Sequence, residues 1–123
     1  MSALILVIED NSKNLKLVRD VLQYAGYEVV EARTGEEGIE AATRCEPDLV
    51  LMDLQLPGID GTETLRQLRA CEQHHIPVVA VTAFAMREDK ERAFAAGFDG
   101  YVEKPISVRA FPSQVNEFLD GRS

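Results

Sequence analysis

Three acidic side chains follow two apolar runs that are typical of buried strands. Glu9 and Asp10 come directly after Leu4–Ile8, and Asp53 comes directly after Leu49–Met52. If these strands are parallel neighbours, their carboxyl ends lie at one edge of a sheet and bring the three carboxylates together. Crowded carboxylates repel one another, and a bound cation relieves that repulsion. Because all the ligands are oxygen, the pattern favours a hard cation such as Mg²⁺.

Two further polar side chains stand at equivalent positions. Thr82 closes a fourth apolar run, and Lys104 closes a fifth. Together with the acids they suit phosphoryl transfer to Asp53, which would become an aspartyl phosphate. A metal would neutralise the transferring oxygens, the ammonium would pair with a phosphate oxygen, and the hydroxyl would donate a hydrogen bond to another. The simpler alternative is that Glu9 and Asp10 only stabilise the start of a helix.

The elements that must position these residues alternate five times along the chain. Five short runs rich in Val, Ile and Leu are predicted strands: Leu4–Ile8, Val29–Ala32, Leu49–Met52, Val78–Val81 and Gly100–Val102. Their apolar residues are continuous rather than alternating, which is typical of a parallel sheet buried on both faces. Segments with helical spacing separate them, so we predict an α/β fold with a doubly wound parallel sheet. In such folds the site lies at the carboxyl ends of the strands.

The sequence makes specific predictions for two of the helices. The segment Arg87–Ala96 has helical propensity but few apolar side chains to bury, so we expect it to be the most mobile helix. Pro112 would interrupt a last helix that began near Val108, so we predict a start at Ala110 or Phe111 or a distortion there.

Composition limits the classes of function. The chain has 123 residues, a length that suits one domain over residues 1–123. Its net charge of -8 argues against nucleic-acid and anionic-membrane partners. Cys45 and Cys71 show no metal-binding spacing. The adjacent His74 and His75 point in different directions, which argues against a metal site there. No run is long enough for a signal or a membrane span, so we expect a cytoplasmic location.

Five motifs at this edge of the sheet carry a family resemblance over the whole chain. They are Ile8-Glu9-Asp10-Asn11, Leu51-Met52-Asp53-Leu54 with Pro57-Gly58 and Gly61, Val81-Thr82-Ala83, and Lys104-Pro105. The chain resembles response-regulator receiver domains of the CheY-like superfamily. The stretch Ile76–Met86, with Lys104 to Ser107, is most similar to single-domain DivK-type regulators and also resembles receivers fused to hybrid kinases.

The resemblance implies a flavodoxin-like (βα)5 sheet with strand order 2-1-3-4-5. It implies that Asp53 is the phospho-acceptor. It also implies that Asp10, Asp53 and the backbone carbonyl of Gln55 ligate Mg²⁺, with Glu9 acting through a bound water.

The remaining implied roles concern the phosphorylated state. Lys104 would bind the phosphate, and its bond to Pro105 would be cis. Thr82 would move toward the phosphate, and Tyr101 would turn inward behind it. Tyr101 could instead be only an amphipathic residue at the edge of the sheet.

The function implied is that of a phosphorelay response regulator, which modifies itself rather than turning over a substrate. The donor would be a sensor histidine kinase or a histidine phosphotransfer protein. It would dock near Asn14, Leu15 and Val18, with Ile106, so that replacing Leu15 and Val18 with Asp should slow transfer. No effector sequence follows Ser123, so we expect the output in another protein.

Two other classes of protein share part of this pattern. A phosphohydrolase of the aspartyl-phosphate type would usually carry a second acid two residues after the nucleophile, where this chain has Gln55. A receiver that only binds a partner would be expected to lack one of the key residues. Asp10, Asp53, Thr82 and Lys104 are all present.

Overall fold

The strands and helices alternate along the chain as predicted. The computed structural model describes residues 3–54, 56, 58, 61–71, 76–83 and 86–120. The elements are β1 (Leu4–Ile8), α1 (Ser12–Tyr24), β2 (Glu28–Ala32), α2 (Gly35–Cys45), β3 (Leu49–Met52), α3 (Gly61–Cys71), β4 (Val78–Thr82), α4 (Arg87–Ala96), β5 (Gly100–Glu103) and α5 (Phe111–Asp120). Three strands are one residue longer than predicted, because β2 begins at Glu28, β4 includes Thr82 and β5 includes Glu103.

The sheet has the order β2-β1-β3-β4-β5, and every pairing is parallel. This order confirms the predicted flavodoxin-like, doubly wound arrangement. In the register of the central strands, Ile8 of β1 lies opposite Met52 of β3. The residues that follow these two strands therefore leave the sheet at the same level.

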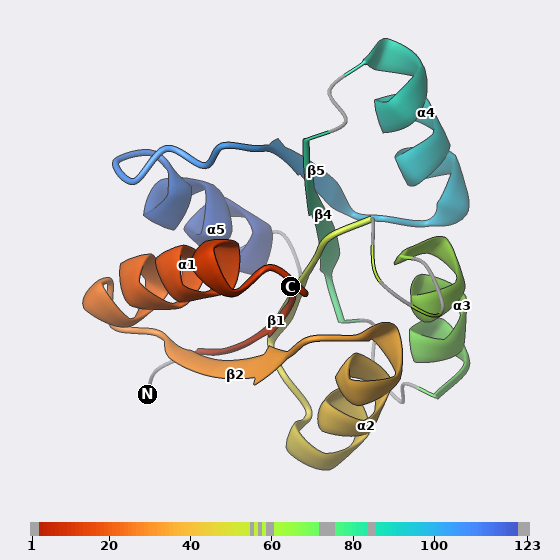
Figure 1. Ribbon diagram of the computed structural model, residues 1–123, viewed down its shortest axis with the longest axis horizontal. Coiled ribbons are helices and arrows are strands. Elements are labelled where there is room, and N and C mark those ends of the chain that lie inside the picture. The colour runs from red at the N-terminus through yellow and green to blue at the C-terminus, as the bar shows by residue number, and fades with distance from the viewer. Residues whose placement is uncertain are drawn as a thin grey trace.

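Helices cover both faces of the sheet, with α1 and α5 on one face and α2, α3 and α4 on the other (Figure 1). The strands β1, β3 and β4 are buried along almost their whole length, as expected for a sheet covered on both sides. On the α1 face the core includes Leu15, Leu22 and Phe111. On the other face it includes Leu65 and Leu68.

The helix ends follow local sequence signals. The side chain of Asn11 accepts hydrogen bonds from the backbone N–H groups of Lys13 and Asn14 and so caps α1, where it fixes the segment that follows Asp10. Helix α5 begins at Phe111, which confirms the start predicted from Pro112. No helix in the described part of the chain is both long and apolar enough to span a bilayer.

Candidate phosphoryl-transfer site

Backbone hydrogen bonds just beyond the strand ends align the site residues of neighbouring strands. The N–H of Asp53 donates to the carbonyl of Ile8 at 3.0 Å, which places Asp53 beside Glu9. The N–H of Lys104 donates to the carbonyl of Thr82 at 2.9 Å. Residues that are far apart in the sequence therefore meet at the carboxyl edge of the sheet.

The three carboxylates form one cluster. One oxygen from each of Glu9, Asp10 and Asp53 lies within 4.8 Å of the other two. Glu9 and Asp53 are buried, whereas Asp10 is exposed and gives the cluster an open side. An all-oxygen set of this kind with access from solvent fits a Mg²⁺ ion. Gln55, whose backbone carbonyl is the other expected ligand, lies outside the described residues, as do His74 and His75.

Lys104 is the counter-charge of the cluster. Its Nζ donates to Oδ2 of Asp53 at 2.8 Å and also to Oε1 of Glu9. Burial alone would lower the pKa of Lys104, but these two hydrogen bonds outweigh burial and hold the pKa above its ordinary value. Burial raises the pKa of Glu9 despite its bond to Lys104 and a further one from the backbone N–H of Asn11. Sequence analysis predicted Lys104 at the site, but it did not predict the hydrogen bond between Lys104 and Glu9.

The other residues of the expected phosphate site lie close by in the sheet. Thr82 is buried at the end of β4, opposite Glu103 of β5. Tyr101 is partly buried, and its hydroxyl has no hydrogen-bond partner among the described residues. The Lys104–Pro105 peptide bond is cis.

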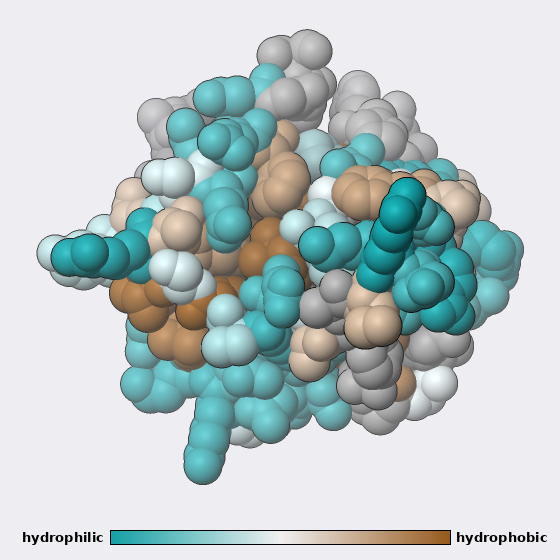
Figure 2. Space-filling view, turned by 90° about the horizontal axis from the view of Figure 1, so that it is seen from above, coloured by the Kyte–Doolittle hydropathy of each residue, from teal (hydrophilic) through white to brown (hydrophobic). Residues whose placement is uncertain are grey.

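A groove of about 290 Å³ runs beside the site, between α1 and the segment before α5. Its lining residues are Asn14, Leu17, Val18, Ala83, Lys104, Pro105 and Ile106. Figure 2 views the molecule from above Figure 1 and shows apolar atoms left of its centre, toward the side of α1 and α5. The lining of the groove thus combines Lys104 of the site with apolar side chains such as Leu17 and Ile106.

One expectation about this surface is wrong in part. Leu15 and Val18 are 3% and 5% exposed, so an aspartate at either position would place an unpaired charge in the core. Val18 still contributes to the groove, as do Asn14 and Ile106, but Leu15 does not. The apolar side chain of α1 that is exposed there is Leu17, at 39%. The sequence signal for the exposure of Leu17 was that this leucine lies outside the apolar stripe of an amphipathic helix.

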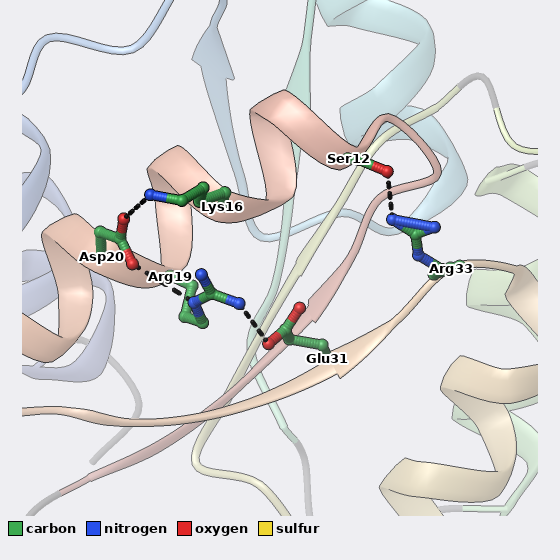
Figure 3. Close-up of polar contacts among 6 residues, drawn as sticks. All are labelled: Ser12, Lys16, Arg19, Asp20, Glu31 and Arg33. Atoms are coloured by element: carbon green, nitrogen blue, oxygen red, sulfur yellow. Dashed lines mark hydrogen bonds and ion pairs between the residues drawn. The ribbon is translucent and has the colours of Figure 1, made fainter.

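One ion pair joins α1 to β2, and two further pairs lie within α1 (Figure 3). Arg19 donates to Glu31 at 3.1 Å and to Asp20 at 3.3 Å, and Lys16 donates to Asp20 at 3.0 Å. Each exposed pair contributes little to stability, about 0–1 kcal/mol. The pair between Arg19 and Glu31 is therefore a surface contact beside the core packing of α1 on the sheet.

The charge cluster predicts the effect of removing one acid. In Mg²⁺-free buffer, Asp53→Asn should raise the free energy of unfolding by on the order of 1–3 kcal/mol, because it removes the repulsion with Glu9 and Asp10 while Lys104 keeps Glu9 as a partner. Denaturant melts with a chelator would measure this. Glu117→Gln, at an exposed position on α5, controls for the overall charge of -8. A loss of stability in Asp53→Asn would show that Lys104 already offsets the repulsion.

Comparisons with known proteins agree with this geometry. Residues 5–116 match the family model described as "Response regulator receiver domain". The polar-differentiation response regulator DivK of Brucella ovis is 43% identical over 120 residues, which cover 97% of this chain and 98% of that protein.

Two solved structures are similar at 30% sequence identity. One is a CheY-like receiver domain protein from Methanospirillum hungatei, with a TM-score of 0.89 over 99% of this chain and 97% of that one. The other is the receiver domain of the sensor histidine kinase PA1611 from Pseudomonas aeruginosa, with a TM-score of 0.89 over 98% of this chain and 99% of that one. That second structure has a magnesium ion coordinated in its active-site cleft.

Proposed function

Because this chain belongs to the response regulator receiver domain family of two-component systems, we propose that it accepts a phosphoryl group on Asp53. The donor is the phosphohistidine of a sensor kinase or a phosphotransfer protein. The observation that carries the proposal is the contact of Lys104 Nζ with Asp53, beside the carboxylates of Glu9 and Asp10. A nucleophile, a cation site and a counter-charge for phosphate thus occupy one place.

The transfer step follows from these positions. A carboxylate oxygen of Asp53 attacks phosphorus, the P–N bond of the phosphohistidine breaks, and the histidine nitrogen keeps the electron pair and takes a proton. Lys104 then exchanges its bond to Asp53 for a bond to a phosphoryl oxygen. The Thr82 hydroxyl, which is buried at the neighbouring strand end, donates to another oxygen.

Asp10 and Asp53, with the backbone carbonyl of Gln55, are the residues that would hold Mg²⁺, and Glu9 would act through water. When bound, the ion neutralises the oxygens of the group in transfer. Asp10 suits this role because it is exposed and can be reached from solvent. Glu9 suits an indirect role because Lys104 and the backbone of Asn11 already occupy both of its oxygens.

Phosphorylation then acts as a switch. The phosphoryl group carries about -1.5 to -2 charges, by analogy with other side-chain phosphates, and it replaces the single negative charge of the Asp53 carboxylate at a partly buried site. Movement of Thr82 toward the new group would change the space behind it and the position of Tyr101, and a downstream protein would bind the altered surface. The groove beside Lys104 is where the donor would dock.

Intact-mass measurement after incubation with acetyl phosphate tests the proposal. The natural protein should gain one phosphoryl group in the presence of Mg²⁺, and it should gain none without Mg²⁺ or in Asp53→Asn. Asp20→Asn, which changes an exposed aspartate on α1, should behave as the natural protein does. A gain that persists in Asp53→Asn, or no gain with either acetyl phosphate or a phosphohistidine protein as the donor, would refute it.

A further inference from the structure

The two ends of α4 are held very differently. At its C-terminal end, Ala93 and Phe98 are buried, and the guanidinium of Arg69 donates to the carbonyl of Gly97 at 3.2 Å. At its N-terminal end, Met86 provides no side-chain cap. Figure 1 shows this helix standing out from the body of the molecule at the upper right. Among the described residues, the C-terminal end of α4 therefore has more contacts with the rest of the molecule than the N-terminal end has.

Lys90 links the N-terminal half of α4 to the sheet. The Nζ of Lys90 lies 5.6 Å from the centre of the Tyr101 ring in β5. An ammonium at this distance from an aromatic ring is attracted by the negative face of the ring. Lys90 lies in the first turns of α4, so the contact acts on the end that has no side-chain cap.

Opposing contributions act on the orientation of the Tyr101 ring. Its hydroxyl oxygen is buried and has no hydrogen-bond partner among the described residues, which disfavours this orientation. Burial, together with the carboxylates of Asp89 and Glu103, raises the pKa of Tyr101, so the unpartnered group remains a neutral hydroxyl. The attraction to Lys90 and the burial of the ring act in the opposite direction. Removing the cation of Lys90 would take away one of the contributions that favour this orientation.

We propose that Lys90 is a positioning residue that holds the Tyr101 ring inward and joins the N-terminal half of α4 to β5, so that ring and helix respond as one unit. The response itself rests on the proposed function, in which phosphorylation of Asp53 supplies the signal. The contact between Lys90 and Tyr101 does not depend on that function and can be tested separately.

The first experiment uses the unphosphorylated full chain labelled with fluorotyrosine. Fluorine NMR separates three tyrosine signals, and Tyr101→Phe identifies the relevant one. Lys90→Met should shift the ratio of inward to outward ring by about two- to five-fold toward outward. Lys90→Arg, which keeps a cation, should restore the ratio. Arg87→Met, which removes an 89% exposed cation from the same helix, should leave the ratio unchanged.

Equal shifts in Lys90→Met and Arg87→Met, or no restoration by Lys90→Arg, would overturn the role of Lys90. If packing of the lysine stem alone held the ring, Lys90→Met would leave the ratio nearly unchanged, because methionine keeps most of that stem.

The second experiment tests the coupled response with beryllofluoride and Mg²⁺ as a stable phosphoryl mimic. In the natural protein, the Tyr101 signal and the backbone amide signals of residues 86–90 should change together. In Lys90→Met, the change at Tyr101 should remain while the change in the helix falls at least two-fold. An undiminished helix response would overturn the coupling. Intact mass with acetyl phosphate is read in parallel, so failure of phosphorylation is distinguished from failure of the Lys90 contact.

Discussion

Replacing Lys104 with methionine should lower the free energy of unfolding of the Mg²⁺-free protein by about 3–5 kcal/mol. The side chains of Lys104, Glu9 and Asp53 are 16%, 5% and 11% exposed. Water can therefore solvate the two carboxylates only in part once the ammonium is gone. Methionine keeps most of the volume of the lysine stem, so the loss reports on charge rather than on a cavity.

Adding Mg²⁺ should recover much of this loss, because a cation bound at the same carboxylates compensates the same charge. Denaturant melts with and without Mg²⁺ would measure both effects. Lys16→Met is the matched control, since Lys16 is 69% exposed and its ion-pair partner among the described residues is Asp20, at 3.0 Å. Its loss should be about 0–1 kcal/mol and independent of Mg²⁺. Equal losses in the two variants would mean that Lys104 does not stabilise the cluster.

The sequence predicted the fold well because a parallel sheet leaves strong local signals. Continuous apolar runs such as Leu49–Met52 occur where a strand is covered on both faces, and the structure buries every residue of that run. The start of α5 could be predicted because Pro112 lacks a backbone N–H and fits only near the beginning of a helix. The carboxylate cluster followed from topology, because parallel strands end at one edge.

The parts that could not be predicted depend on tertiary distances. Nothing near Lys104 in the sequence indicates that its ammonium also reaches Glu9. The contact of Lys90 with Tyr101 depends in the same way on how α4 lies against β5. Glu46 ends α2 with a positive φ of 48°, where glycine or asparagine is the usual residue, so composition gave no signal for it.

The docking surface shows a different kind of error. Leu15 and Val18 belong to the apolar stripe of α1, and a stripe that packs on the sheet cannot also be freely exposed to a partner. Helical phase places Leu17 about 100° away from Val18 on α1, and the structure exposes it beside the groove. Exposure and helical phase therefore make Leu17 the residue of α1 with which to test docking.

Leu17→Asp should slow phosphoryl transfer from a phosphohistidine protein by about 5- to 30-fold and leave the reaction with acetyl phosphate unchanged. The exposed leucine would contact a protein donor, and loss of such an apolar contact typically costs about 1–2 kcal/mol of binding. A small donor such as acetyl phosphate needs only the site itself. Rates of phosphoryl gain by intact mass would measure both reactions.

Tyr24→Asp is the matched control, because Tyr24 is 96% exposed on the same helix and does not line the groove. It makes the same change from apolar to acidic without touching the proposed contact, so transfer should proceed at the natural rate. Leu15→Asp should instead unfold the protein, which thermal melts would reveal. If Leu17→Asp slowed both donors equally, the effect would lie in the site rather than in docking. Natural rates with both donors would exclude Leu17 from the interface.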